Sequence, residues 1–311
     1  MGKICVLASG GDAPGMNAFF EAVYLYGTAK GLEVYAAIDG YNGLIDNKIV
    51  KMTPENSIGI SARGGCVFKC GRCPRVMEHE GFAIAVANIK KNRFTTIIVA
   101  GGNGSLIGAR RFKNAGVNVI FVPVTIDNDV DTTNQSLGFS SACESSVKMI
   151  DMLKNTMETS NRDHVVQLMG RSSNALAVTV GTATFADLVD MEGARHTPEQ
   201  VAEVFLRNRR AGKMSNMLIM QERKGKDFTE DILFGVNFVK QLCVACKDDN
   251  IRITTLGYLQ RGAETSCRDR FLAVMYARAA VESILVNQFG VGVAMVNEAV
   301  CYIKIELAPI P

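Results

Sequence analysis

The segment Val122-Pro123-Val124-Thr125-Ile126-Asp127-Asn128-Asp129 takes an apolar strand directly into a threonine and two carboxylates. Ligands of parallel α/β proteins bind at the carboxyl ends of the strands, so an acidic catalytic pair would be placed here. Alternate residues of an extended segment point the same way, and Asp127 and Asp129 could therefore face one cleft. An Asp-Asn turn with solvated carboxylates explains the same residues. The segment alone leaves both interpretations open.

This strand belongs to a series of short apolar runs that alternate with amphipathic stretches along the chain. Strands are predicted at 4–8, 33–37, 96–100, 117–122, 164–168, 217–221 and 253–256. Helices are predicted at 17–30, 105–115, 144–157 and 271–287. Such alternation predicts α/β architecture, with parallel sheets covered by helices on both faces. No linker rich in Pro, Gly or Ser interrupts it, so we expect closely packed lobes between which the chain crosses more than once.

The composition describes an ordinary globular protein and excludes several functions. The 311 residues are 48% hydrophobic, which allows a substantial core and predicts two domains. The charged fraction is 21%, the formal net charge is +3, and there is no long Lys/Arg run, so we expect no nucleic-acid partner. No apolar stretch approaches the ~18 residues that span a bilayer, so we expect no membrane association. The first apolar run is too short for a signal peptide, which favours a cytoplasmic location.

Nine cysteines without a secretory signal are expected to be reduced thiols. Cys66-x3-Cys70-x2-Cys73 has the spacing of iron–sulfur ligands in radical enzymes, and Cys243-x2-Cys246 could add zinc ligands. Cysteine also serves as a small apolar residue in protein interiors. We favour this second interpretation, because no histidine accompanies either cluster.

Two glycine-rich loops follow predicted strands. The first is Ser9-Gly10-Gly11-Asp12-Ala13-Pro14-Gly15, in which backbone N–H groups and the next helix start can approach an anion. The second is Gly101-Gly102-Asn103-Gly104-Ser105, with Gly108 further on, and it has neither P-loop nor Rossmann spacing. Turn chemistry alone would explain one or two of these glycines. Two such loops favour a polyphosphate site.

Two further strand ends carry Met169-Gly170-Arg171 and Glu222-Arg223. The planar fork of Arg171 suits a phosphoryl group in transfer, although a single arginine at a strand end is more often a surface residue. Arg252 and Arg261 flank Leu256-Gly257-Tyr258-Leu259-Gln260 and supply further cations for an anionic substrate.

Together these segments resemble the ATP-dependent 6-phosphofructokinases over nearly the whole chain. The matching segments are Ser9–Asn17, Asp39-Gly40-Tyr41, Arg63-Gly64-Gly65, Gly101–Ser105, Thr125–Asp129, Met169-Gly170-Arg171, Glu222 and Leu256–Gly262. The resemblance implies two doubly wound, mainly parallel-sheet lobes. Residues 1–138 and 260–304 would form the nucleotide-binding lobe, and residues 139–259 and 305–311 the sugar-phosphate-binding lobe. A metal cluster at Cys66, Cys70 and Cys73 would displace Arg72, which the resemblance assigns to phosphate.

The resemblance implies transfer of the γ-phosphoryl group of ATP, with Mg²⁺, to the 1-hydroxyl of fructose 6-phosphate. Asp127 looks like the general base, acting with Thr125, and Arg171 and Arg72 look like the cations of the transition state. The nucleotide site would comprise Gly11, Tyr41, Arg72, Cys73, Gly102, Asn103, Gly104, Ser105 and Gly108. The sugar-phosphate site would comprise Thr125, Asp127, Asp129, Arg162, Met169, Gly170, Arg171, Glu222, Arg252, Tyr258 and Arg261. Family counterparts of Arg162 and Arg252 cross a subunit interface, which implies a homo-oligomer, usually a dimer of dimers.

The chain departs from the family pattern at several of these positions. Asn103 replaces the aspartate that contacts magnesium, so the metal site is weakened and Asp129 is the second candidate ligand. Tyr258 replaces a histidine of the sugar-phosphate pocket. Gly104 matches the branch that uses ATP, whereas Val124 matches neither the ATP nor the pyrophosphate branch. Regulatory arginines are replaced by Glu21, Leu25 and Pro54, although Lys213 remains.

Two functions of different classes follow from these residues. The first is a working phosphofructokinase, which the retained Asp127, Arg171 and Glu222 favour. The second is a catalytically impaired paralogue that binds nucleotide or sugar phosphate and acts as a regulatory or assembly subunit, together with a paralogous subunit, which Asn103 and Tyr258 suggest. An iron–sulfur or dinucleotide redox protein is a third interpretation that rests on spacing alone.

Overall fold

A computed structural model describes residues 2–171, 173–223, 225 and 227–306, which divide into two compact units. The first unit contains residues 2–141 and 261–306, and the second contains residues 142–260. Residues 305 and 306 differ from the expected assignment to the second lobe. Ile305 is 1% exposed and packs in the core of the first unit, where its N–H donates to Gly290 O at 3.1 Å. Residues 307–311 lie outside the described residues.

The first unit is built on an eight-stranded sheet in the order β12-β11-β5-β4-β1-β2-β3, with β6 beside β5. The strands are β1 (Lys3–Ala8), β2 (Glu33–Ala37), β3 (Ile49–Lys51), β4 (Thr96–Gly101), β5 (Val119–Thr125), β6 (Leu137–Gly138), β11 (Val291–Val296) and β12 (Ala299–Lys304). Neighbours pair in parallel except in β2/β3 and β11/β12. This confirms the predicted α/β class with mainly parallel strands.

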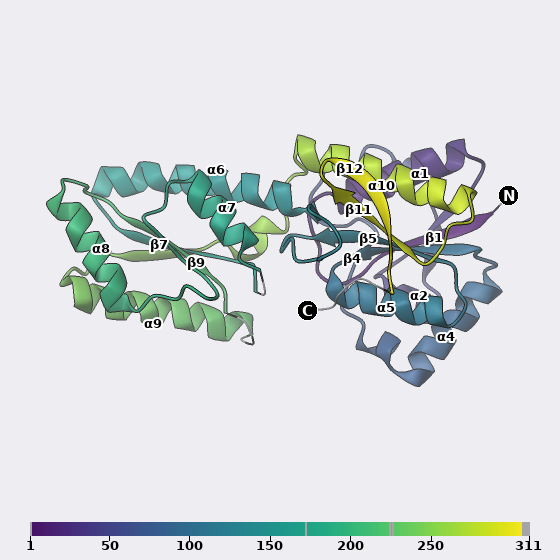
Figure 1. Ribbon diagram of the computed structural model, residues 1–311, viewed down its shortest axis with the longest axis horizontal. Helices are drawn as coiled ribbons and strands as arrows, with labels where there is room; N and C mark the ends of the chain where they lie inside the picture. Colours follow the sequence, from purple (N-terminus) through teal and green to yellow (C-terminus); the bar gives the residue numbers. More distant parts are fainter. Residues whose placement is uncertain (1, 172, 224, 226, 307–311) are drawn as a thin grey trace. The chain divides into compact units, whose positions relative to one another are not determined.

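Helices cover both faces of this sheet. They are α1 (Met16–Ala29), α2 (Tyr41–Ile45), α3 (Pro54–Ser57), η1 (Pro74–Met77), α4 (His79–Lys91), α5 (Asn103–Asn114) and α10 (Cys267–Leu285). Figure 1 shows α1 and α10 side by side on one face and α2, α4 and α5 on the other. Alternate strand residues such as Leu7, Val99 and Phe121 meet α2, α4 and α5 in one buried cluster. Strands covered on both sides must be apolar throughout, which explains their continuous hydrophobic runs.

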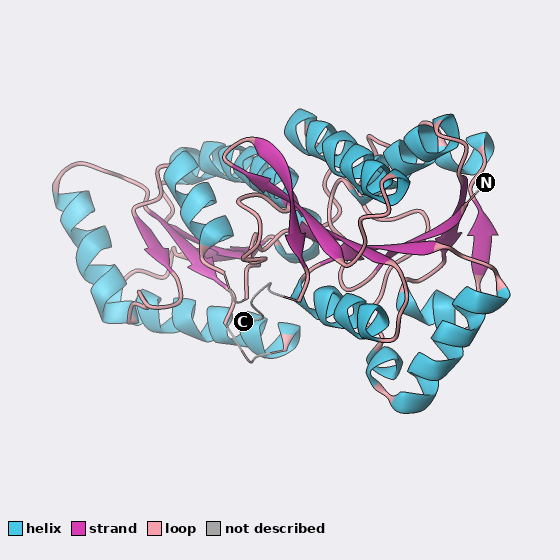
Figure 2. Ribbon diagram, turned by 45° about the vertical axis from the view of Figure 1, so that its right-hand side comes forward, coloured by secondary structure: helices cyan, strands magenta, loops and turns pink. Residues whose placement is uncertain are grey.

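The second unit has a four-stranded parallel sheet in the order β10-β7-β9-β8. Its elements are α6 (Phe139–Ser160), which spans the boundary, β7 (His164–Leu168), α7 (Ala175–Ala183), β8 (Leu188–Asp190), α8 (Pro198–Arg210), β9 (Met217–Gln221), α9 (Phe228–Cys246), β10 (Arg252–Thr255) and η2 (Gly257–Gln260). In Figure 2, helices again flank the strands on both faces. Buried Phe205, Leu218 and Leu242 join α8, β9 and α9 in one core.

Two local differences from the predicted elements have clear causes. β5 continues to Thr125 instead of ending at 122, because Val124 and Thr125 pair with Leu137 and Gly138 of β6. The hairpin β11–β12 was not predicted. Its turn residues Asn297 and Glu298 both have positive φ, at 51° and 62°, but they lack the Asn-Gly signature of such turns.

Among the described residues, no helix is long and apolar enough to cross a membrane.

Candidate active site

Three loops of the first unit meet because they follow neighbouring parallel strands. β4 lies between β1 and β5, so the loops after Ala8, Gly101 and Thr125 leave the same edge of the sheet. The Ser105 hydroxyl donates to Ser9 O at 3.0 Å and joins the first two loops. A Cβ on Gly101 would lie 2.3 Å from Ser105 Oγ, so only glycine fits at this crossing. The structure therefore brings both glycine loops to the carboxylate segment.

The start of α5 offers backbone N–H groups to an anion. Its N-cap, Gly102, has no side chain to accept a bond from them, and no acidic residue occupies the first turn. The first N–H groups of a helix lack partners within the helix, and the macrodipole makes this end positive. A Cβ on Gly104 would meet nothing within 4 Å, so the surface of this turn is open. The arrangement suits a phosphate group.

The carboxylate segment turns sharply after β5. The Asp127 N–H donates to Thr125 Oγ1 at 3.2 Å, and Asn128 adopts a left-handed conformation with φ 49°. The Asn128 side chain accepts from Ser136 N at 2.7 Å and donates to Asn134 O at 3.2 Å. Asp127 and Asp129 are half-buried. An Asp-Asn turn is thus present, and it holds the two carboxylates in a partly desolvated position.

Asn103 and Asp129, the two residues expected to bind a metal ion, are in contact with each other. The Asn103 amide donates to Asp129 O at 3.0 Å, whereas Asn103 Oδ1 is buried without a hydrogen-bond partner. Burial raises the pKa of the Asp129 carboxyl. A carboxylate beside an unpartnered amide oxygen is an oxygen donor set of the kind that Mg²⁺ uses together with substrate phosphates and water. These residues therefore fit the expected metal, with one charge fewer than a pair of aspartates.

Arg261 lies over the first glycine loop. Its guanidinium pairs with Asp12 Oδ1 at 2.5 Å, and its Nε donates to Asp12 O at 3.1 Å. A Cβ on Gly11 would lie 2.4 Å from Arg261 Nη2, so the loop approaches this arginine closely. Arg261, expected among the sugar-phosphate residues, is thus held by the loop expected to bind nucleotide.

The remaining expected nucleotide residues surround α5. Tyr41 is 1% exposed and donates to Ser105 O at 2.8 Å, and its ring stacks on Phe112 with centroids 5.6 Å apart. A Cβ on Gly108 would lie 2.7 Å from this ring. Cys73 is buried, whereas Arg72 is exposed. Tyr41 and Gly108 therefore pack beneath the first turns of α5. Arg72, the cation expected in the nucleotide site, is exposed at the surface.

In the second unit, adjacent strands β7 and β9 bring Gly170, Arg171 and Glu222 together. Glu222 Oε1 accepts from Gly170 N at 3.3 Å and Arg171 N at 3.0 Å. The Met169 N–H donates to Gln260 Oε1 at 2.9 Å, and Gly170 takes φ 120°, which favours glycine. Burial raises the pKa of Glu222, while the charge of Arg171 opposes the shift. The carboxylate thus fixes the backbone beside Arg171.

Arg162 and Arg252 lie at the N-terminal ends of the strands of this sheet, opposite the C-terminal ends that carry Met169 and Glu222. Arg162 precedes β7 and Arg252 begins β10, where it is paired in register with His164. Both are exposed. At about 3.3 Å per residue, the length of β7 separates them from Met169 and Glu222 by roughly 16 Å. Within one unit the structure therefore does not bring them to Arg171. Tyr258 is 57% exposed on η2.

Glu21 has a structural partner that the sequence did not reveal. Its carboxylate accepts hydrogen bonds from the N–H groups of Gly59, Ile60 and Ser61, at 3.0, 3.0 and 2.8 Å. Three successive N–H groups form a concavity that suits an anion. Glu21, which stands where the resemblance expects a regulatory arginine, therefore fills this anion-binding concavity with its own carboxylate. No spacing rule links residue 21 to residues 59–61.

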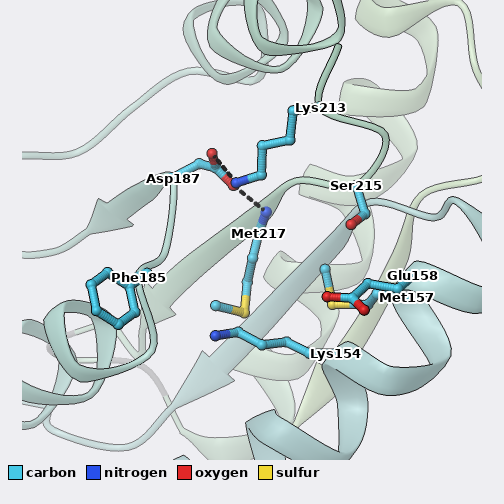
Figure 3. A pocket seen from close by; sticks show the side chains of 8 residues that line it. All are labelled: Lys154, Met157, Glu158, Phe185, Asp187, Lys213, Ser215 and Met217. Atoms are coloured by element: carbon cyan, nitrogen blue, oxygen red, sulfur yellow. Dashed lines mark hydrogen bonds and ion pairs between the residues drawn. The ribbon is translucent and has the colours of Figure 1, made fainter.

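A pocket of about 210 Å³ in the second unit contains none of the expected catalytic or substrate residues. Its lining comprises Lys154, Met157, Glu158, Phe185, Asp187, Lys213, Ser215 and Met217 (Figure 3). Lys213 donates to Asp187 Oδ1 at 2.6 Å, and Met217 N donates to Asp187 Oδ2 at 2.9 Å. The lysine that the resemblance connects with regulation is thus already paired with a carboxylate.

The cysteine clusters do not gather into a metal site in the described parts of the chain. No three His, Cys, Asp or Glu side chains there form a group that could hold a metal ion. Cys73 packs in the apolar core with Tyr41 and Val76, and Cys246 packs with Phe205 and Leu242. These two cysteines serve as small apolar residues.

Comparison with known proteins identifies the family. The phosphofructokinase family model matches residues 3–284. An ATP-dependent 6-phosphofructokinase of Thermotoga petrophila is 34% identical over 298 residues, which cover 95% of this chain and 90% of the relative. One from Streptococcus agalactiae is 33% identical, with coverage of 96% and 85%. A solved phosphofructokinase from Saccharomyces cerevisiae superposes with a TM-score of 0.87 at 27% identity, over 98% of this chain but only 45% of the yeast chain. The chain therefore belongs to the phosphofructokinase family of enzymes.

Proposed function

We propose that this chain transfers the γ-phosphoryl group of ATP to the 1-hydroxyl of fructose 6-phosphate, giving fructose 1,6-bisphosphate and ADP. The observation that carries the proposal is the meeting of three loops at one sheet edge, where two glycine loops flank the half-buried Asp127. The relatives' names, which specify ATP, support the choice of donor. A glycolytic role of this kind implies the cytoplasm.

Asp127 acts as the general base that takes the proton of the sugar hydroxyl during attack on phosphorus. Its N–H bond to Thr125 Oγ1 and the tethered Asn128 hold the backbone that carries the carboxylate. The open start of α5 receives phosphate oxygens through its N–H groups. Arg72 and Arg171 balance charge on the group in transfer, and the backbone beside Arg171 is fixed by Glu222.

Asn103 and Asp129 would hold the magnesium ion that accompanies ATP. When bound, this ion neutralises charge on the phosphates. Asn103 contributes the unpartnered Oδ1, and its amide bond to Asp129 O keeps the two residues in register. Because an amide oxygen carries no full charge, we expect weaker metal binding than a pair of carboxylates would provide.

The proposed enzyme is a homo-oligomer, a dimer of dimers. Arg162 and Arg252 stand at the opposite strand ends from Met169 and Glu222, which supports their service to the sugar phosphate of a partner subunit. Fructose 6-phosphate would be bound by Met169, Glu222, Arg171 and Tyr258 of one subunit. Tyr258 on η2 is exposed, so its side chain is accessible to this ligand.

The second candidate is a catalytically impaired paralogue that binds nucleotide or sugar phosphate as a regulatory subunit. Asn103 at the metal and Tyr258 at the sugar favour it. A site that no longer catalyses a reaction does not require a general base held in position. The hydrogen bonds that hold Asp127 and Asn128 therefore favour the active enzyme.

A coupled assay of ADP release with fructose 6-phosphate separates the two candidates. The wild type and Asn103→Asp are measured with Mg²⁺ and then Mn²⁺, and Asp127→Asn serves as the inactive control. Turnover by the wild type that Asp127→Asn abolishes supports the enzyme. Absence of turnover under both metals, with nucleotide binding intact by calorimetry, would overturn it. Rescue of an inactive wild type by Asn103→Asp would assign the defect to the metal contact.

A further inference from the structure

Two cysteines of the segment after Gly64-Gly65 stand at a tight turn next to the first glycine loop. The Lys69 N–H donates to Cys66 O at 3.1 Å, and Lys69 adopts φ 61°. This reversal places Cys66 Sγ 3.6 Å from Lys69 O, the carbonyl oxygen of the peptide that leads into Cys70. The two thiols lie close enough for each to shift the pKa of the other. Both are partly exposed, whereas Cys73 is buried.

The framework around the pair is held on both sides. Asn17 accepts from Val67 N at 2.8 Å and donates to Arg63 O at 2.9 Å. Phe68 is 3% exposed against Phe20, and its carbonyl accepts from Asp39 N at 3.0 Å. The segment between the cysteines therefore keeps the thiols close, and little entropy is lost when they react with each other.

The two thiols differ in reactivity. The interaction with Cys66 lowers the pKa of Cys70, and the same interaction raises the pKa of Cys66. Cys70 also lies near the charges of Asp12, Asp39 and Arg261, of which the two carboxylates oppose the shift and the guanidinium favours it. Cys70 is accordingly the nucleophile and Cys66 the resolving thiol.

We propose that Cys66 and Cys70 form a peroxide-oxidisable dithiol whose disulfide acts on the first glycine loop. The Cys70 thiolate attacks one oxygen of a hydroperoxide such as H₂O₂, the O–O bond breaks, and Cys70 sulfenic acid and hydroxide form. Cys66 sulfur then attacks the Cys70 sulfur, its thiol proton passes to the hydroxide from the first step to give water, and the sulfenic oxygen leaves as hydroxide, which takes up the proton that Cys70 released on ionisation. Two thiols are oxidised to one disulfide while the hydroperoxide is reduced to water, or to water and an alcohol. An external dithiol reverses the reaction.

The disulfide would reach the loop through the next residue of the chain. Gly10 N donates to Gly71 O at 3.0 Å, and Ser9 forms a bridge with Gly71. A Cβ on Gly71 would lie 2.5 Å from Asp39 Oδ1, so this residue has no space to absorb a shift. Pulling Cys70 toward Cys66 strains the bond to Gly10. This step rests on the proposed nucleotide-binding role of the loop, whereas formation of the disulfide does not.

Peptide mapping tests the disulfide independently of any activity. The reduced chain is treated with one equivalent of H₂O₂, blocked with N-ethylmaleimide and digested with trypsin. Cleavage after Arg63, Lys69 and Arg72 puts the two thiols in peptides 64–69 and 70–72, and Cys73 in peptide 73–75. We expect 64–69 linked to 70–72, with the link lost on reduction and in Cys66→Ser and Cys70→Ser. Both thiols alkylated, linkage through 73–75, or sulfinic acid without a link would overturn the proposal.

The second cysteine pair provides a matched control. Cys243 and Cys246 stand three residues apart in α9, where Cβ atoms are about 5–6 Å apart, and a disulfide needs about 3.8 Å. Cys243→Ser should therefore leave the oxidised product unchanged. A Cys243–Cys246 link of equal yield would show that proximity in sequence alone decides the reaction and would overturn the assigned role of the turn.

Kinetics on the same samples test the coupling to nucleotide. We expect oxidation to raise the KM for ATP about fivefold, the equivalent of one lost hydrogen bond of about 1 kcal/mol, with the KM for fructose 6-phosphate unchanged. Dithiothreitol should restore the first value, and Cys66→Ser should show no response to H₂O₂. A disulfide that forms without a change in the KM for ATP would overturn the coupling. Absence of turnover in both the reduced and the oxidised protein would refute the proposed function. The peptide map would still test whether Cys66 and Cys70 form a disulfide.

Discussion

At the scale of single residues, the environment of each carboxylate decides its role. Asp127 and Asp129 are held in a half-buried turn, Glu222 fixes a backbone loop, and Glu21 fills a concavity of N–H groups. Composition could not separate these roles, because a carboxylate looks the same in sequence wherever its oxygens point. The partners that distinguish them are 2 to 52 residues away along the chain.

Asp127→Asn removes the proposed general base while keeping its shape. We expect kcat to fall about 10²–10⁴-fold, the usual contribution of general-base catalysis, with the KM for ATP little changed. Steady-state kinetics in the coupled assay measure both values. The exposed Asp131→Asn is the matched control and should keep wild-type kcat. A loss of less than tenfold in Asp127→Asn would assign the base elsewhere.

The raised pKa of Glu222 predicts a pH dependence of sugar-phosphate binding. Burial raises this pKa, so on acidification Glu222 takes up its proton at a higher pH than an ordinary glutamate. The protonated group accepts the Gly170 and Arg171 N–H bonds less strongly, and the KM for fructose 6-phosphate should rise as the pH falls. In Glu222→Gln this rise should disappear. Equal pH profiles for the two proteins would contradict the prediction.

Glu21→Ala leaves three backbone N–H groups without their acceptor. We expect the free energy of unfolding to fall by about 1–3 kcal/mol, because these bonds are to a charged group but lie partly in solvent. Urea unfolding measures the change. The exposed Glu203→Ala in α8 is the control and should stay within about 0.5 kcal/mol of the wild type. A neutral Glu21→Ala would mean that water replaces the carboxylate without cost.

At the scale of elements, hydrophobic runs predicted strands well and predicted their ends less well. The predicted strands at 33–37, 164–168 and 217–221 coincide with β2, β7 and β9. Buried parallel strands are apolar throughout, which makes them visible in sequence. The end of β5 was wrong, because Thr125 stays in the sheet through its pairing with Gly138. Strand ends depend on a pairing partner, which can lie far away along the chain.

The packing of α5 on α2 gives a prediction at this scale. A Cβ on Gly108 would lie 2.7 Å from the Tyr41 ring, which stacking on Phe112 and the bond to Ser105 O prevent from moving. Gly108→Ala should therefore destabilise the protein by about 1–3 kcal/mol through overpacking. Thermal unfolding tests this. Gly104→Ala, in the open first turn of the same helix, is the control and should be neutral or stabilising by up to about 1 kcal/mol.

At the scale of the whole molecule, the arginines proposed for the sugar-phosphate site bear on whether a partner subunit completes that site. Arg162 and Arg252 lie at the N-terminal ends of strands in the four-stranded sheet. Met169 and Glu222 directly follow the C-terminal ends of its strands. A site that uses all four must draw them from more than one copy. The resemblance predicted this exchange, and no spacing in the sequence indicates it.

Subunit complementation measures the exchange. Asp127→Asn and Arg162→Ser should each be nearly inactive alone. If Arg162 serves the partner's site, mixed dimers contain one site with both changes and one with neither. Random reassembly of equal amounts should then restore about a quarter of wild-type activity. No recovery after verified subunit mixing would place Arg162 in its own subunit's site, or outside any site.

The sequence by itself determined the fold class, the family and the strand ends proposed to carry the chemistry, because apolar periodicity and glycine spacing are local properties of the chain. The carboxylates at 127 and 129 were recognisable in this way. Only the tertiary structure decided that Asn103 Oδ1 is buried without a partner, that Arg261 is held by Asp12, and that Glu21 binds residues 59–61. Each depends on segments far apart in the chain, and their meeting is set by strand order and packing. The sequence shows which functional groups are present, but only the structure shows which residues they contact.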